Sequence, residues 1–78
     1  MGNNQQSVLT LKDLAVQKEI SWIEEIKNMS QDKLNAMDLK NITVGKVLII
    51  EAYKKNDESR IKYYEKRLEQ LRKEAEKN

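Results

Sequence analysis

The side chains that most often carry out catalysis are almost absent from this chain. Its 78 residues include no His and no Cys. It therefore has no disulfide, no zinc site of imidazole or thiolate ligands, and no nucleophile activated by a histidine base. These absences exclude most hydrolase and metalloprotein designs. We expect a protein that is not an enzyme and that has no cofactor, no metal and no small-molecule substrate.

Two pairs of neighbouring carboxylates are the remaining candidates for acid and base chemistry. They are Glu24-Glu25 and Asp57-Glu58. Adjacent residues of a helix point about 100° apart, so Glu24 and Glu25 do not converge. Asp57 and Glu58 suit the first turn of a helix, where the helix dipole favours negative charge. Neither pair predicts a catalytic site.

The dipeptide Gly45-Lys46 is the one place where a phosphate-binding loop is worth testing. The earlier glycine of that motif would fall at position 40, which is Lys40. Val47 stands where the motif needs Ser or Thr to reach the magnesium ion. The motif therefore fails, and function has to be sought in the helices and their surfaces.

The spacing of apolar residues predicts an all-α fold, a small bundle of three to four helices with a long C-terminal amphipathic helix. We expect residues 8–78 to form a single helical domain and residues 1–7, MGNNQQS, to form a disordered tail because they are polar and lack periodicity. Caps are predicted at Thr10 with Asp13, and at Ser30. The predicted helices cover residues of about 11–28, 31–37, 44–55 and 58–77.

The first predicted helix has a broad apolar face that should touch two neighbours. At about 100° per residue, its centre is predicted to be Leu11, Ala15, Trp22, Ile26 and Met29. The residues on its flank are Val16, Ile20 and Ile23.

The segment 44–50 is ambiguous because its β-branched residues also suit a strand. A strand needs a partner, and no other segment alternates apolar and polar residues beside turn residues. We therefore favour a helix, although the sequence alone leaves the strand open. Because this segment is apolar nearly all round, we expect it to be the central and most buried element. We also expect two aromatic side chains, Trp22 of the first helix and Tyr53 of the third, to be core residues.

The last helix carries a seam of apolar residues at alternating intervals of three and four, as in a coiled coil. A chain of this size builds only a modest core, so we expect self-association or the binding of a protein partner through this seam. Its predicted interface residues are Ile61, Tyr64, Leu68, Leu71 and Ala75.

Charge supplies a second hypothesis, a nucleic-acid-binding accessory protein. The chain has a net charge of +2, and residues 54–78 hold nine basic against six acidic side chains. Lysines spaced along the last helix would follow a phosphate backbone, with Tyr63 available for stacking. The predicted contact residues are Arg60, Lys62, Tyr63, Lys66, Lys73 and Lys77.

The leading hypothesis is a non-enzymatic protein-interaction module that forms a homo-oligomer or binds another protein. A small regulator, inhibitor or assembly factor fits, and the abundance of Lys, Asn and Ile suggests a phage or mobile-element origin. No apolar segment approaches the roughly 20 residues of a membrane span, and residues 1–7 lack the pattern of a secretion signal. We therefore expect a cytoplasmic protein that does not act at a membrane.

Overall fold

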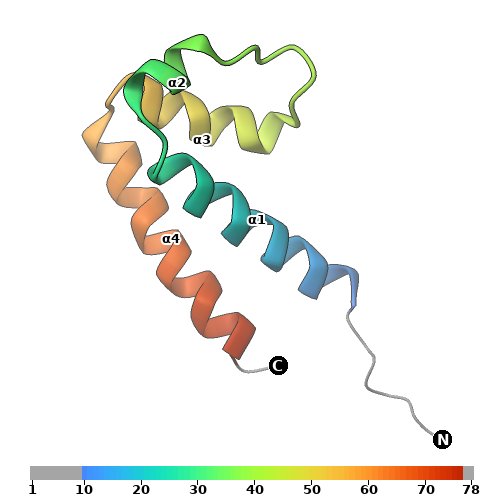
Figure 1. Cartoon of the computed structure of the whole chain (residues 1–78). Helices are drawn as coiled ribbons and strands as arrows, with labels where there is room; N and C mark the ends of the chain where they lie inside the picture. Colours follow the sequence, from blue (N-terminus) through green and yellow to red (C-terminus); the bar gives the residue numbers. More distant parts are fainter. Residues whose placement is uncertain (1–9, 77–78) are drawn as a thin grey trace, which may run out of the picture.

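A computed structural model describes residues 10–76 of the chain, and this part contains four helices and no strand (Figure 1). The all-α prediction is therefore confirmed. The predicted disordered tail, residues 1–7, lies outside the described residues, as does Lys77. The helices are α1 (Leu11–Lys27), α2 (Gln31–Ala36), α3 (Val44–Lys54) and α4 (Glu58–Glu76).

Local capping sets where the first two helices begin. The Thr10 hydroxyl accepts a hydrogen bond of 3.1 Å from the Asp13 N–H, and the Asp13 carboxylate accepts one of 3.2 Å from the Thr10 N–H. This is the reciprocal capping box expected from the sequence. The Ser30 hydroxyl caps α2 with a single hydrogen bond, which it accepts from the Lys33 N–H at 3.2 Å. Each cap satisfies backbone donors that a helix start leaves unpaired.

A tight corner separates α3 from α4. Asn56 has a φ of 55°, in the left-handed region. Its N–H donates to the Tyr53 carbonyl at 3.2 Å, while the Asp57 N–H donates to the Ala52 carbonyl at 2.9 Å. This bond pattern ends a helix and satisfies its last carbonyls. The Asp57 carboxylate then accepts from the Arg60 N–H at 3.4 Å and starts α4.

The ambiguous segment 44–50 is helical and forms most of α3. Helices α1, α2 and α4 all pack against it, so its buried side chains Ile49, Ile50 and Ala52 find partners on three sides. As expected, α3 is the central helix and has more buried side chains than any other described helix, but Val44 is 74% exposed and Leu48 is 43% exposed. Within the described residues, α1, α2 and α4 leave the side of α3 that carries Val44 and Leu48 exposed.

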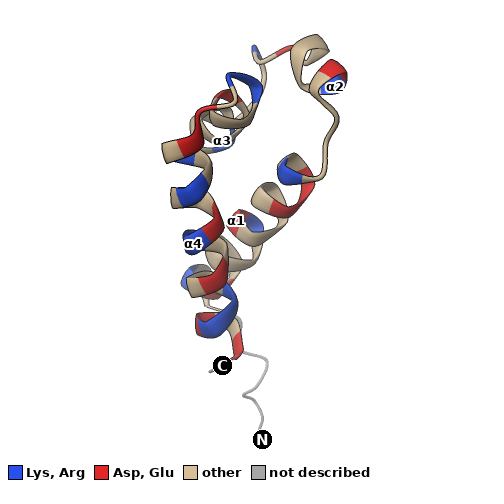
Figure 2. Ribbon diagram, turned by 90° about the vertical axis from the view of Figure 1, so that its left-hand side faces the viewer, with Lys and Arg blue, Asp and Glu red and all other residues tan. Residues whose placement is uncertain are grey.

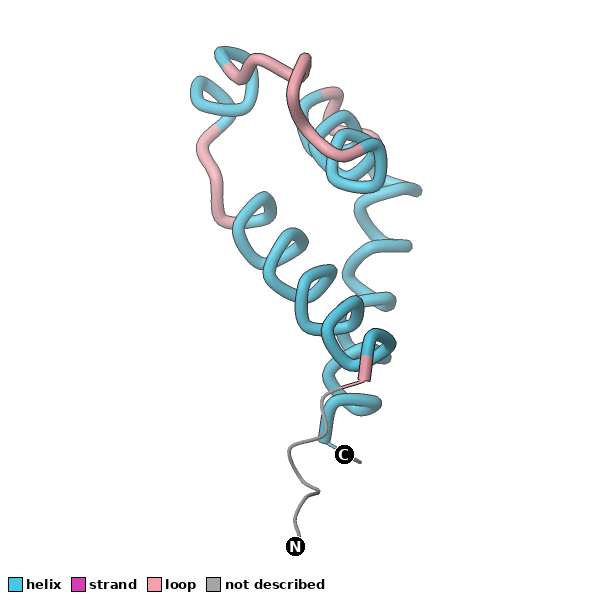
Figure 3. The backbone as a smooth tube through the Cα atoms, turned by 90° about the vertical axis from the view of Figure 1, so that its right-hand side faces the viewer, coloured by secondary structure: helices cyan, strands magenta, loops and turns pink. Residues whose placement is uncertain are grey.

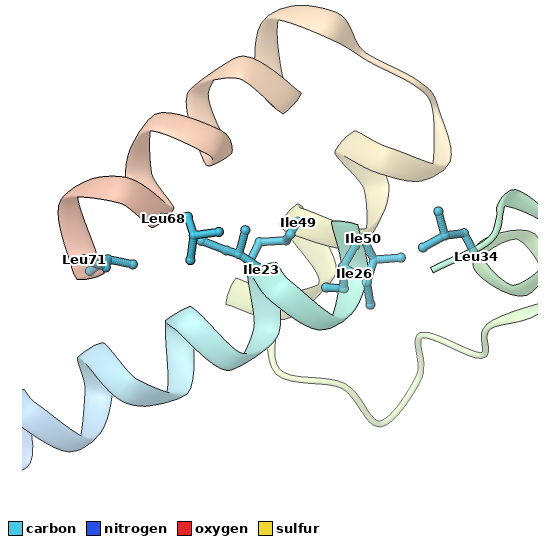
Figure 4. Close-up of a cluster of buried hydrophobic side chains, with 7 residues drawn as sticks. All are labelled: Ile23, Ile26, Leu34, Ile49, Ile50, Leu68 and Leu71. Carbon is cyan, nitrogen blue, oxygen red and sulfur yellow. The ribbon is translucent and has the colours of Figure 1, made fainter. Parts of the chain in front are cut away.

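The core joins all four helices through aliphatic side chains. Ile23 and Ile26 of α1 and Ile50 of α3 have no exposed surface, and Trp22 and Tyr53 pack at the edge of this cluster. Figure 4 shows the buried side chains in a continuous row between the ribbons. The row consists of Leu71, Leu68, Ile23, Ile49, Ile50, Ile26 and Leu34.

The side of α1 that faces the core differs from the predicted one. Ile23, placed on the flank by the sequence, is fully buried, whereas Leu11 is 85% exposed. Helix α4 lies antiparallel beside α1 and covers the Ile23 side, whereas α3 lies against only the C-terminal half of α1 (Figures 1 and 3). Within residues 10–76, no helix therefore covers Leu11 and Ala15 at the N-terminal end of the predicted face.

Candidate functional site

The predicted C-terminal seam forms the inner face of α4 within a single chain. Leu68 and Leu71 are each 2% exposed, and Tyr64 packs against the same core. Ile61 and Ala75 are half-buried. A partner interface made of Leu68 and Leu71 is therefore not a feature of this fold, because α1 already occupies the position that a second helix would take.

An apolar hollow opens where α1, α3 and α4 meet, and we call it the Trp22 hollow. Its volume is 360 Å³. Trp22 contributes from α1, Gly45 and Leu48 from α3, and Tyr63 and Tyr64 from α4. Three helices therefore shape an apolar recess that is open to solvent.

Exposed apolar side chains gather around this hollow. The described residues include five large apolar side chains that are exposed, and three of them, Val44, Leu48 and Tyr63, lie on it or one helical turn away. Tyr63 is 58% exposed. Single exposed apolar residues are ordinary on a protein surface, whereas a cluster marks a contact surface. This clustering makes the hollow the candidate functional site.

Two aromatic rings of α4 form one wall of the hollow. The ring centroids of Tyr63 and Tyr64 are 5.0 Å apart, and the ring planes meet at 75° in an edge-to-face arrangement. Burial raises the pKa of the Tyr64 hydroxyl above its ordinary value of 10.0. This tyrosine is therefore uncharged at neutral pH, and the wall is apolar with hydroxyl groups at its edge.

An ion pair forms the polar rim of the hollow. Arg67 Nε donates to Glu19 Oε2 at 2.7 Å, and Arg67 Nη2 donates to Glu19 Oε1 at 3.0 Å. This two-pronged pairing raises the pKa of Arg67 above its ordinary value. Both charges are neutralised across α1 and α4, so the rim carries no net charge and holds the two helices in register.

The candidate nucleic-acid contacts form a separate, solvent-facing stripe on α4. Lys62, Lys66 and Lys73 are exposed and make no ion pair with a described residue, whereas Arg60 lies 4.0 Å from Asp57. Acidic and basic residues alternate along this helix in Figure 2. Tyr63 lies between the stripe and the hollow, and Lys77 lies outside the described residues.

The paired carboxylates take structural roles. Glu24 accepts a hydrogen bond from Arg72 of α4, and Glu25 lies 3.1 Å from the Lys46 ammonium of α3. The two acids therefore bridge to different helices. Among the described residues, no group of three potential metal ligands gathers at one place. Within the same part of the chain, no helix combines the length and the apolar character needed to cross a membrane.

The sequence indicated an excess of apolar side chains on the third helix, but their spacing did not show which side of that helix would be exposed. Val44 and Leu48 lie four residues apart on a helix that is apolar nearly all round. Such a helix must either be covered on every side or present an apolar stripe to a partner. Gly45 was considered only as part of a phosphate loop, whereas it lies against Trp22.

No protein-family model matches this chain, and neither a curated protein nor a solved structure matches it. What the chain binds must therefore be inferred from its own surface.

Proposed function

We propose that this chain is a non-enzymatic helical protein-interaction module that binds an apolar segment of a protein partner in the Trp22 hollow. One observation carries this proposal: Val44, Leu48 and Tyr63 remain exposed around a recess built by three helices. A helix with apolar side chains at intervals of three and four residues is the partner structure that suits such a recess. A small cytoplasmic regulator, inhibitor or assembly factor of a phage or mobile element would use this function.

Substitution of Leu48 tests this proposal directly. Leu48→Glu places a charge in the hollow without touching the core, since this side chain is 43% exposed. Gln17→Glu is the matched control, because it makes the same change in charge on the exposed, opposite side of α1. We expect the wild type and Gln17→Glu to form a complex, either with themselves or with a protein captured from a host lysate. Leu48→Glu should lose that complex.

Two measurements cover both kinds of partner. Sedimentation velocity over a wide concentration range detects self-association, and affinity capture with the three proteins as bait detects a different partner. The proposal is wrong if the wild type associates with nothing, or if every association survives Leu48→Glu. Circular dichroism of each variant shows whether the helices are intact.

A second candidate function uses the lysine stripe of α4. Three ammonium groups that make no ion pair within residues 10–76, at Lys62, Lys66 and Lys73, lie on one exposed side of the helix next to Tyr63. Binding of RNA or DNA there should weaken steeply with salt, because displaced counterions return to the phosphates. A gel shift at low and moderate salt tests it, with Lys62→Gln/Lys66→Gln as the variant. Absence of retardation at micromolar protein would exclude this candidate.

A further inference from the structure

Two lysines lie beside the Tyr63 wall of the Trp22 hollow. Lys62 and Lys66 line a depression on α4 that adjoins the hollow through Tyr63. At about 100° per residue, Lys66 lies about 60° and Lys62 about 100° round the helix from Tyr63, in the same direction. Glu69 and Glu65 follow in that direction, at about 120° and about 160°. The two cations therefore lie between the hollow and the acids.

Three other cations close to the hollow have an acidic partner within residues 10–76. These ion pairs are Arg67 with Glu19, Lys46 with Glu25, and Arg60 with Asp57. Lys62 and Lys66 make no ion pair within the same residues. The α4 edge of the hollow therefore keeps positive charge that the described part of the chain does not pair.

The other two edges of the hollow differ in charge. On α1, Lys18 is exposed one turn before Trp22 and makes no ion pair within residues 10–76. On α3, Glu51 and Lys55 line a depression beside Leu48 and carry opposite charges. The α3 edge is therefore neutral, and the excess of positive charge lies on α1 and α4.

We infer that the apolar segment bound in the Trp22 hollow is an acidic amphipathic helix, whose carboxylates lie against Lys62 and Lys66 of α4 and against Lys18 of α1. This inference rests on the proposed function and adds the charge of the partner to it. Opposite charges at the rim of an interface speed association and fix the orientation of the partner, while apolar groups at its centre supply most of the affinity. The hollow has this arrangement, with an apolar lining and lysines at two edges.

The dimensions of a helix suit this arrangement. An α-helix with its side chains is about 10–12 Å across, so a helix whose apolar side enters the hollow extends over the wall formed by Tyr63. Residues adjacent to an apolar anchor point about 100° to either side of it. Carboxylates at those positions lie at the edges of the contact, where flexible lysine stems bring ammonium groups to meet them.

The apolar lining favours a peptide over a nucleic-acid strand as the occupant. Leu48 lines the hollow and Val44 is exposed one helical turn before it, and neither aliphatic side chain offers a ring on which a base could stack. Phosphates drawn to Lys62 and Lys66 would also lie close to the two acids in the same depression. An acidic apolar helix covers the aliphatic side chains and meets the lysines from the side of the hollow, away from those acids.

Selection from a display library of helical peptides tests the charge of the partner. Each peptide of about 18 residues, or five turns, carries leucines at intervals of three and four, and its flanking positions vary among Glu, Gln and Lys. Peptides that still bind the Leu48→Glu variant are discarded. We expect the remaining peptides to be enriched in Glu at the flanking positions, relative to Gln and Lys.

Titration of one selected peptide measures the contribution of the lysines. The emission of Trp22 reports binding, because the chain has a single tryptophan and the peptides have none. Lys62→Gln/Lys66→Gln should raise the dissociation constant at least about threefold, and the difference should shrink as salt is added. Lys27→Gln/Lys33→Gln is the matched control and should leave the constant unchanged, since it removes two exposed lysines that do not line the hollow. Circular dichroism checks the helices.

The outcomes separate this inference from the proposed function. Peptides that are rich in Glu and depend on Lys62 and Lys66 support the inference. Selection of peptides rich in Gln or Lys overturns it, as does an acidic peptide that binds the wild type and Lys62→Gln/Lys66→Gln equally. In both of these cases the proposed function stands. If no peptide depends on Leu48, the proposed function fails as well.

The same proteins would reveal two other occupants. A dimer of the wild type that Leu48→Glu dissociates, and that excludes the selected peptides, would make a second copy of the chain the occupant. A single-stranded DNA oligonucleotide that requires Lys62 and Lys66, when no selected peptide does, would assign these lysines to nucleic acid. Either result overturns the inference.

Discussion

Gly45 of α3 lies directly against the indole ring of Trp22 in α1. A Cβ atom at position 45 would lie 3.3 Å from Cζ3 and 4.0 Å from Cη2 of that ring. The missing side chain lets the first turn of α3 approach α1 closely. This contact forms one side of the Trp22 hollow, so the shape of the candidate site depends on a glycine.

Substitutions at Gly45 should therefore act through Trp22. Gly45→Ala gains about 1 kcal/mol of helix propensity but pushes the ring by a few tenths of an ångström, so the free energy of unfolding should change by less than about 1 kcal/mol. Gly45→Val adds branched carbons against the ring and should lower the free energy of unfolding by about 1–3 kcal/mol. Urea unfolding followed by the emission of the single tryptophan measures both. Equal stability of all three proteins would contradict the close contact.

The orientation of α1 shows what periodicity predicts and what it leaves undetermined. The sequence placed apolar residues over more than one side of this helix, and that breadth is correct. It did not show that α4 would lie beside α1 while α3 would contact only the C-terminal half of α1, at residues such as Trp22 and Glu25. Those choices depend on where the later helices cross, which no local pattern encodes. Leu11 was therefore predicted to be buried and is exposed.

The seam on α4 illustrates a related limit. Intervals of three and four residues correctly identified Leu68 and Leu71 as residues that need a helical partner. The same spacing serves a partner helix in the same chain or in another chain. Here α1 supplies it, and both side chains are 2% exposed. An exposed apolar site lies instead on α3, where Leu48 is 43% exposed although this helix has the most buried side chains.

Truncation of a core leucine and of a leucine in the hollow should lower the free energy of unfolding by different amounts. Leu68→Ala removes a side chain that is 2% exposed, and we expect the free energy of unfolding to fall by about 2–5 kcal/mol. Leu48→Ala removes one that is 43% exposed and should cost less than about 1 kcal/mol at low protein concentration. Urea unfolding at several protein concentrations measures both. A similar, small loss for Leu68→Ala would mean that α1 does not cover this residue.

The corner between α3 and α4 should respond to glycine. Asn56 adopts a φ of 55°, which costs least for glycine and less for Asn than for Ala. We expect Asn56→Gly to keep or raise the free energy of unfolding by up to about 1 kcal/mol, and Asn56→Ala to lower it by about 1 kcal/mol. We expect the midpoint temperature of thermal unfolding to decrease in the order Gly, Asn and Ala at position 56. The reverse order would show that α3 continues through position 56.

The pair of Glu19 and Arg67 should couple α1 to α4. Its two hydrogen bonds of 2.7 and 3.0 Å are a stronger arrangement than a single surface contact. Because both side chains are partly exposed, we expect a coupling energy of about 1 kcal/mol between Glu19→Gln and Arg67→Gln in a double-mutant cycle. Lys12 and Glu74, at 4.0 Å, provide the comparison and should give a smaller value. Equal coupling in the two cycles would contradict the paired geometry.

The hydroxyl of Tyr53 is buried and has no hydrogen-bond partner among the described residues. A buried polar atom without a partner reduces stability, so Tyr53→Phe should leave the free energy of unfolding unchanged or raise it by up to about 1 kcal/mol. Urea unfolding near neutral pH measures this change. A loss of more than about 1 kcal/mol would show that the hydroxyl has a partner in solution.

The same residue should also make stability depend on pH in the alkaline range. Burial, with a smaller contribution from the charge of Glu65, raises the pKa of Tyr53 above its ordinary value of 10.0. Above that pH the unfolded chain releases the proton before the folded chain does, so the unfolded state binds fewer protons and stability falls as pH rises toward the folded pKa. Tyr64, whose pKa is also raised by burial, adds to the fall. The urea midpoint, measured at about pH 8 and about pH 11, checks this dependence. We expect the midpoint to fall less in Tyr53→Phe than in the wild type. An equal fall in both proteins would show that Tyr53 titrates as it does in the unfolded chain.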